Sequence, residues 1–91
     1  MFRVVRVNGP SMAPTLVDGD FVVVIDRPCR IGDVVVVMHP QYGRIVKRVA
    51  ARDGSGRIAL EGDGALSTSR EALGWTSPHD VLGRVCLRVR R

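Results

Sequence analysis

The chain has 91 residues, which suits one domain and is too short for two. With 45% hydrophobic, 25% charged and 4% aromatic residues, its composition is that of a globular protein and excludes fibrous and disordered classes. The net charge is +5, and no apolar run approaches the ~18 residues that span a bilayer, so the sequence predicts a soluble, cytoplasmic protein without a membrane span.

Short apolar segments separated by glycine- and aspartate-rich turns run through the chain. Segments rich in valine and isoleucine are typical of β-strands, and the Gly-Asp and Asp-Gly pairs between them are turn signals. The turn over residues 52–56 is expected to join two strands as a hairpin. The predicted strands are Phe2–Val7, Phe21–Asp26, Asp33–His39, Arg44–Arg52, Gly56–Glu61 and Gly83–Val89.

Two short helical turns and one long loop complete the predicted elements. The helical turns are expected at Ser11–Leu16, where Pro14 limits the turn, and at Pro78–Val81. The polar segment Gly62–Ser77 has no clear periodicity and is predicted to be a long functional loop. We therefore expect a single, mostly β domain over residues 1–91, built as a coiled antiparallel sheet or a partly open barrel.

A serine between two prolines marks the first candidate site. Pro10 and Pro14 constrain the loop, and Gly9 allows its backbone to approach a ligand closely. Such a loop can expose the Ser11 hydroxyl and present backbone N–H groups to a developing oxyanion. The alternative is structural: Ser11 caps a short turn while Met12 packs into the core.

The only lysine marks the second candidate site. Thirteen of the 14 basic residues are arginine, which keeps its proton in proteins, whereas a lysine in a dry site can be neutral near pH 7. On a strand, Lys47 shares one face with Ile45 and Val49, and desolvation there favours a general base. The alternatives are a lysine retained by chance, or one at a strand edge whose head reaches water. Arg48, on the opposite face, is expected to be a surface or ion-pair residue.

Other chemistries have weaker signals. Neither His39 nor His79 has the setting of a catalytic triad, and both are expected on exposed loops. Cys29 and Cys86 lack metal-ligand spacing, so no metal and no cofactor is predicted. Acids beside glycines, such as Asp63, are explained by turn chemistry. The arginines are scattered and aromatic residues are few, which argues against a nucleic-acid partner.

Four segments, in order, resemble motifs of the signal peptidase I family of serine proteases. Gly9–Leu16 resembles the nucleophile box, and Ile45–Val49 resembles the box that holds the family's basic lysine. Leu60–Gly64, with the serines after it, resembles the Gly-Asp-Asn box, and Leu82–Val85 resembles the closing strand. The serine and lysine boxes together are a specific signal, and the resemblance covers nearly the whole chain.

The resemblance implies a peptidase S24/S26-like domain, with the coiled sheet that signal peptidases share with self-cleaving repressors. Within it, Ser11 would be the nucleophile, Lys47 would take and return its proton, and the backbone N–H of Ser11 would meet the oxyanion. The other residues assigned to the oxyanion and substrate loop are Gly9, Pro10, Met12 and Pro14.

The third box departs from the family pattern. Gly64 stands where the family has asparagine, and the segment before Arg70 is shorter and lacks an aspartate. In the family a small hydroxyl residue of this box orients the lysine, and the resemblance assigns that role to Ser67, with Ser69 as the second choice. The departures leave open the ion-pair role of Arg70 and the choice between the two serines.

Membrane signal peptidases carry N-terminal membrane helices, whereas here only ten residues precede Ser11. The chain is most similar to the soluble, short bacterial proteases that mature nickel-type superoxide dismutase by trimming an N-terminal propeptide. The resemblance thus implies a serine endopeptidase that binds its protein substrate as an extended peptide at a strand edge. The alternatives are a catalytically degenerate peptide-binding module of the same fold, and nucleic-acid binding through the arginine tail. The sequence indicates no oligomeric state.

Overall fold

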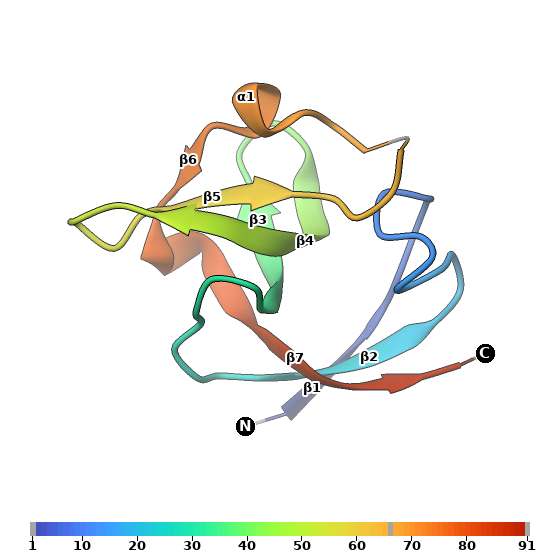
Figure 1. Cartoon of the computed structure of the whole chain (residues 1–91). Coiled ribbons are helices and arrows are strands. Elements are labelled where there is room, and N and C mark those ends of the chain that lie inside the picture. The colour runs from blue at the N-terminus through green and yellow to red at the C-terminus, as the bar shows by residue number, and fades with distance from the viewer. Residues whose placement is uncertain (1, 66, 91) are drawn as a thin grey trace.

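The computed structural model describes residues 2–65 and 67–90, and this part of the chain forms one antiparallel sheet of seven strands. The strand order is β1-β2-β7-β3-β4-β5-β6, and the sheet is strongly coiled without closing into a barrel (Figure 1). The strands are β1 (Phe2–Arg6), β2 (Phe21–Ile25), β3 (Val34–His39), β4 (Gly43–Arg52), β5 (Ile58–Glu61), β6 (Trp75–Thr76) and β7 (Val81–Val89). The helices are α1 (Arg70–Leu73) and the 3-10 turn η1 (Pro78–Asp80).

The six strands predicted from the sequence are all present, with ends shifted by one or two residues, and the mostly β, open antiparallel fold is confirmed. The helical turn near Pro78 is confirmed as η1. One prediction is wrong. The segment Gly62–Ser77 is not one loop, because it contains α1 and β6, which are too short to produce a periodic pattern. Residues 11–16 form hydrogen-bonded turns in which the N–H of Leu16 donates to the carbonyl oxygen of Met12 at 2.9 Å, as the predicted short helical turn requires.

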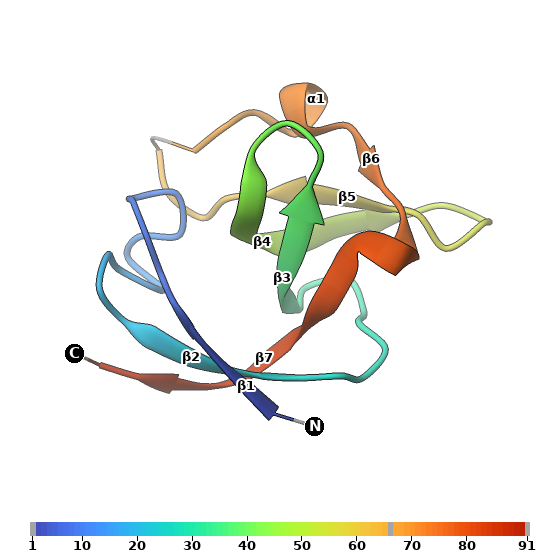
Figure 2. The same ribbon diagram turned by 180° about the vertical axis from the view of Figure 1, so that it is seen from behind.

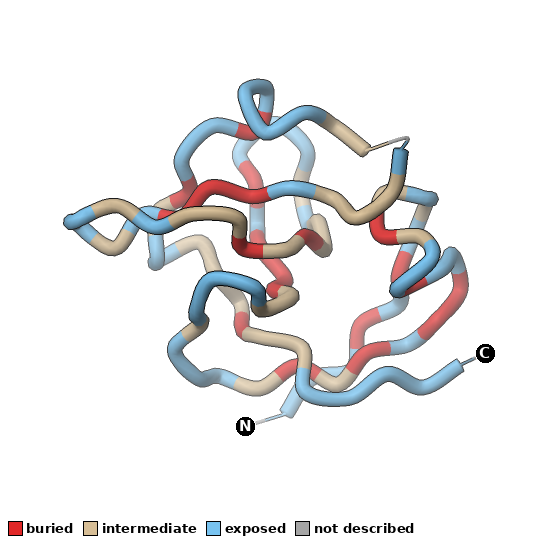
Figure 3. Tube along the Cα trace, in the orientation of Figure 1, coloured by how far each residue is buried: buried red, intermediate tan, exposed pale blue. Residues whose placement is uncertain are grey.

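The central strand β3 is buried on both faces, which explains its unbroken run of valines. Val36 packs in a first core that joins β1, β2 and the loop between them. Val35 and Val37, on the other face, pack in a second core with residues from β4, β5 and α1. Figure 3 shows buried residues along these strands and exposed ones on most connecting turns. A strand between two cores can be apolar at every position.

Irregularities in β7 produce the coiling. The pairing of β7 with β2 and its pairing with β3 each shift register once, as a β-bulge does. Bulges raise the local twist of a sheet. Between them, a Cβ atom on Gly83 would lie 2.4 Å from the carbonyl oxygen of Ile25, so only glycine fits this crossing. The twist curls β1 and β2 toward β4. As a result β1 and β4, the first and fifth strands of the sheet, face one another without pairing.

Candidate active site

The loop after β1 is held from both sides. Met12 is fully buried and Leu16 nearly so, and both pack in the first core. Gly9 has a φ of 82°, which favours glycine, and its N–H donates to Oδ1 of Asp18 at 2.8 Å. Ser11 stays half-buried at the surface, and its hydroxyl caps no turn within the described residues. Core packing by Met12 is therefore confirmed, and it anchors the loop that presents the serine.

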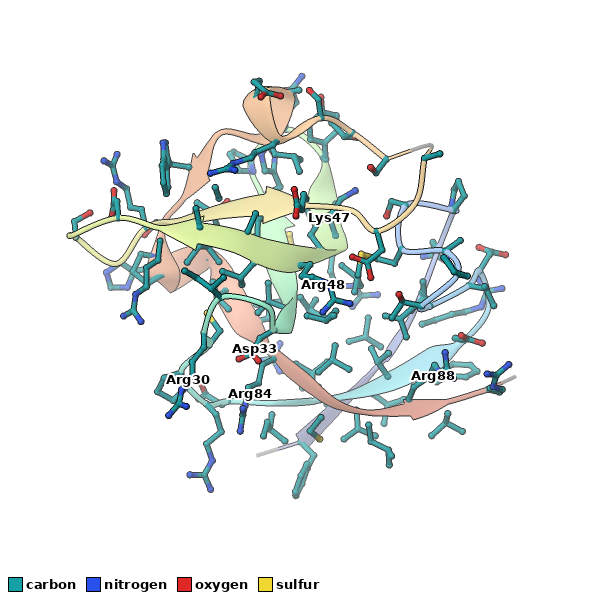
Figure 4. All side chains as sticks on the ribbon, viewed as in Figure 1. Arg30, Asp33, Lys47, Arg48, Arg84 and Arg88 are labelled. Carbon is teal, nitrogen blue, oxygen red and sulfur yellow. The ribbon has the colours of Figure 1, made fainter. Side chains whose placement is uncertain are left out.

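Lys47 lies on β4 and is only 4% exposed. Its face of the strand carries Ile45 and Val49, both packed in or against the second core, as alternation predicts. Burial removes water from the ammonium group and lowers the pKa of Lys47. Figure 4 shows Arg48 on the other side of the strand from Lys47. The sequence therefore builds a desolvated amine beside aliphatic side chains.

Ser11 and Lys47 line one pocket of about 340 Å³. No hydrogen bond joins Ser11 Oγ and Lys47 Nζ within the described residues, although both residues line this cavity. The lining residues of this pocket are Val5, Arg6, Val7, Asn8, Pro10, Ser11, Tyr42, Arg44, Ile45, Val46, Lys47, Thr68 and Leu73. The fold has thus brought together two residues that lie far apart in the sequence.

The shape of the pocket follows from its lining. It touches the four consecutive residues 5–8 at the end of β1 and the four consecutive residues 44–47 of β4. Successive side chains of a strand point to opposite faces, so a cavity that meets four in a row must run along the edge of the backbone. The pocket is a groove between two strand edges, which face one another in Figure 2. We refer to it as the β1–β4 groove.

Both edges of the β1–β4 groove have free backbone groups. β1 is the edge strand of the sheet, and the backbone N–H and carbonyl of Val7 bond to the turn before β2. Alternation then directs the backbone groups of Arg6 and Asn8 into the groove. β5 pairs with β4 only from Arg48 onward, so residues 43–47 have no strand on their outer side among the described elements. The coiled sheet brings β1 and the first half of β4 face to face in opposite directions: in Figure 2 the chain runs upward along β1 and downward from the β3–β4 turn into β4.

The glycines of the third box pack directly against the serine loop. The N–H of Gly64 donates to the carbonyl oxygen of Ser11 at 2.8 Å. A Cβ atom on Gly62 would lie 2.3 Å from that oxygen, and one on Gly64 would lie 2.5 Å from the carbonyl oxygen of Pro10. Such distances leave no room for a side chain. Glycine at position 64, where the related motif has asparagine, therefore matches the close approach of the two segments.

Asp63 joins the serine loop to β4. Nε and Nη2 of Arg48 donate to the two carboxylate oxygens at 2.8 and 2.7 Å, and Thr15 Oγ1 donates to Oδ2 at 2.7 Å. The hydrogen bonds from Arg48 lower the pKa of Asp63, burial opposes this, and the bond from Thr15 lowers the pKa further. Arg48 is confirmed as an ion-pair residue. The turn role expected for Asp63 is incomplete, because this carboxylate also connects the third box to the serine loop through Thr15 and to β4 through Arg48.

Replacing Asp63 by asparagine is expected to reduce the free energy of unfolding by about 2 kcal/mol at pH 7, because it removes charged acceptors from Arg48. The folded pKa of Asp63 is depressed, so its contribution is complete above the unfolded pKa and is lost as pH falls through the folded pKa. Urea unfolding at several pH values measures this. Glu71→Gln, an exposed carboxylate on α1, is the matched control. A stability difference that did not shrink as pH was lowered would contradict the assignment.

The model of the family described as "Signal peptidase, peptidase S26" matches residues 1–85. The chain belongs to this signal peptidase family. Comparison with curated proteins gives no match. As a member of the S26 family the chain is a signal-peptidase-like protease, and its substrate is a peptide. Within the described residues no helix has both the length and the apolar character needed to cross a bilayer.

The hydroxyl groups of the S26 third box have distinct places here. Ser67 donates to the carbonyl oxygen of Gly64 at 2.9 Å, and Ser69 caps α1 by accepting from the N–H of Ala72 at 3.2 Å. Thr68, between them, lines the β1–β4 groove with Lys47. Sequence reasoning passed over this threonine, although it lies within the same box. Arg70 opens α1, and the ion pair of this region is the one between Arg48 and Asp63.

The prediction that His39 lies on an exposed loop is wrong, since His39 ends β3 and is only 7% exposed. Its Nδ1 accepts the N–H groups of Gln41 and Tyr42 at 3.1 and 3.3 Å, so Nε2 carries the proton and donates to the Leu73 carbonyl at 2.9 Å. His39 thereby holds the β3–β4 turn against α1, whose Leu73 lines the groove. His79 is exposed on η1, as predicted.

Proposed function

We propose that this chain is a serine endopeptidase that uses Ser11 as nucleophile and Lys47 as general base. The observation that carries the proposal is the shared pocket: the hydroxyl and the desolvated amine line one groove that is open to a peptide. Lowering the pKa of an amine makes it neutral, and so basic, nearer to pH 7. The bond between the two groups is expected to form when substrate excludes water, because such contacts are often loose before binding.

The chemistry follows from these two groups. Ser11 Oγ attacks the carbonyl carbon of the scissile peptide bond and gives its proton to Lys47 Nζ. The tetrahedral intermediate collapses as the C–N bond breaks, and the ammonium of Lys47 returns the proton to the leaving amine. A water molecule then gives a proton to Lys47 and attacks the ester on Ser11. The acyl C–O bond breaks, the acid is released, and Lys47 returns the proton to Ser11 Oγ. Protons and electron pairs balance without a cofactor.

The oxyanion of the intermediate needs fixed donors. The backbone N–H of Ser11 has no acceptor among the described residues and is available for this role. Gly9 lacks a side chain, and its N–H already donates to Asp18, so it offers no second donor. Thr68 joins Ser67 and Ser69 as a candidate for orienting Lys47, because it lines the groove with the lysine.

The substrate is expected to bind as an added strand. A peptide in the β1–β4 groove can pair with the free backbone groups on both sides and so bridge the first and fifth strands of the sheet. Binding of this kind requires an extended segment and favours small side chains where the strand passes Ser11. A folded domain would not fit between the two edges.

The substrate we propose is the N-terminal propeptide of a nickel-type superoxide dismutase. Its basis is the resemblance of the motif set to the maturation proteases of that enzyme, within a family whose members cleave peptides. Mass spectrometry of a propeptide-bearing substrate, before and after incubation with the chain, tests this choice by the mass of the new N-terminus.

A phosphonate probe that reacts with activated serines is expected to label Ser11, and its rate should rise with pH through the lowered pKa of Lys47. Below that pKa the lysine is an ammonium and cannot accept the serine proton, so labelling is slow at acid pH. The measurement is adduct mass against time at several pH values. Ser11→Ala, which removes the nucleophile, should give no adduct and so checks that the label is on Ser11. An intact protein that gave no adduct at any pH would favour the peptide-binding module instead.

A further inference from the structure

The β1–β4 groove is lined by cations. Arg6 and Arg44 line it together with Lys47, and no aspartate or glutamate is among its described lining residues. The ion pairs formed by described residues use Arg48, Arg57 and Arg84. The two groove arginines are thus not paired with any described carboxylate, and both are exposed to a ligand. A groove built in this way has a positive potential that its own fold does not neutralise.

The two arginines lie on opposite sides of the reacting groups. Arg44 precedes Lys47 by three positions on β4, and Arg6 precedes Ser11 near the end of β1. Because β1 and the first half of β4 run in opposite directions, the two arginines approach Ser11 and Lys47 from opposite ends of the groove (Figures 1 and 2). Three residues of strand span about 10 Å. Nη1 of Arg6 donates to Oδ1 of Asn8 at 2.8 Å, which holds its guanidinium near the edge of the groove.

Resting on the proposed function, we infer that the substrate is an acidic peptide with an Asp or Glu side chain about three residues from the cleaved bond on each flank, one carboxylate pairing with Arg44 and the other with Arg6. Guanidinium groups bind carboxylates through paired N–H donors, which fixes the position of the peptide as well as its charge. The net charge of +5 adds a longer-range attraction for an acidic segment. Tyr42 is the only aromatic residue in the described lining, so the groove lacks the stacked rings that nucleic acid would require.

The test uses two sets of extended peptides with a single scissile bond. Within each set the peptides are identical except at one position about three residues from that bond, where they carry Asp, Asn or Lys; one set varies the N-terminal flank and the other the C-terminal flank. We expect the Asp peptide of each set to have about tenfold higher kcat/KM than its Asn partner, and the Lys peptide to be poorest. The preference should shrink as salt is added, because the pairs are exposed.

Charge variants identify the residues responsible. Arg44→Gln should lower the Asp-to-Asn ratio roughly threefold in one set, and Arg6→Gln should do so in the other. Arg44→Glu should invert the preference of its own set toward the Lys peptide. The matched control is Arg30→Gln, which removes the same charge from an exposed residue that Figure 4 shows on the far side of the molecule from Lys47. It should leave the ratio unchanged. Equal kcat/KM for the Asp and Asn peptides of both sets would overturn the inference.

Binding to Ser11→Ala separates this inference from the proposed function. Fluorescence anisotropy with the same peptides reports charge selection without any cleavage. If the Asp peptide binds more tightly but the unaltered chain cleaves nothing, the acidic preference stands and the endopeptidase proposal fails. If cleavage occurs without a charge preference, the endopeptidase proposal stands and the acidic preference fails. If Ser11→Ala binds no Asp peptide at all, the acidic preference is also wrong.

Discussion

Replacing Lys47 by methionine is expected to abolish peptide cleavage while raising the free energy of unfolding. Methionine is close to lysine in length and apolar, so it can pack beside Ile45 and Val49 without an amine. Loss of the general base should lower kcat/KM by roughly a thousandfold or more. The pKa of Lys47 is lowered in the fold, so the folded state binds fewer protons than the unfolded state and wild-type stability rises with pH. The stabilisation by Lys47→Met should therefore be largest below that folded pKa, which urea unfolding at several pH values measures.

Two matched variants separate the charge of Lys47 from its role as a base. Lys47→Arg keeps a cation that cannot lose its proton, and we expect it to be inactive and less stable than the wild type. Ser11→Ala removes the nucleophile and should be as inactive as Lys47→Met, with little change in stability because its side chain is only half-buried. Full activity in Lys47→Arg would show that Lys47 is not the base. A Lys47→Met chain less stable than wild type at every pH would show that its burial costs nothing.

The sequence predicted the features that depend on local pattern. Short segments rich in valine and isoleucine, bounded by turn signals, placed the six longer strands. Alternation along a strand put Lys47 on one face with Ile45 and Val49. The loop bounded by Pro10 and Pro14 was recognised because proline restricts backbone dihedrals wherever it occurs. Each of these inferences concerns residues within a few positions of one another, where covalent geometry sets the result.

Contacts between distant segments could not be predicted in this way. Nothing near Asp63 in the sequence indicates that it binds both Thr15 and Arg48, which approach it only when the sheet coils. The burial of His39 depends on α1, a helix of four residues that leaves no periodic signal. The acid and the histidine therefore looked like ordinary turn and loop residues. Their roles arise from coiling of the sheet, which the register shifts of β7 produce and a strand pattern does not encode.

Gly62→Ala is expected to impair catalysis although residue 62 has no side chain and bonds to no substrate. Its Cβ atom would lie 2.3 Å from the carbonyl oxygen of Ser11 and 2.4 Å from Cβ of Ser67. The serine loop must shift to relieve these overlaps, and a displacement of about 1 Å at a nucleophile can cost on the order of a hundredfold in rate. We expect that loss in kcat/KM, with a fall of about 1–3 kcal/mol in the free energy of unfolding.

Gly54→Ala is the control, because a Cβ atom there would meet nothing within 4 Å, and it should change neither quantity appreciably. The double variant Gly62→Ala/Ser67→Gly distinguishes displacement of Ser11 from general strain. It removes the overlap with the Ser67 side chain but keeps the one with the Ser11 carbonyl, so stability should recover in part while activity stays low. If both stability and activity recovered, the overlap with the Ser67 side chain, and not the one with the Ser11 carbonyl oxygen, would be what excludes a side chain at position 62. Ser67→Gly alone is the reference for activity, because Ser67 is itself a candidate for orienting Lys47. The remaining overlap involves only a backbone oxygen, so activity in the double variant far below that of Ser67→Gly would show that the third box sets the position of the serine through main-chain contact.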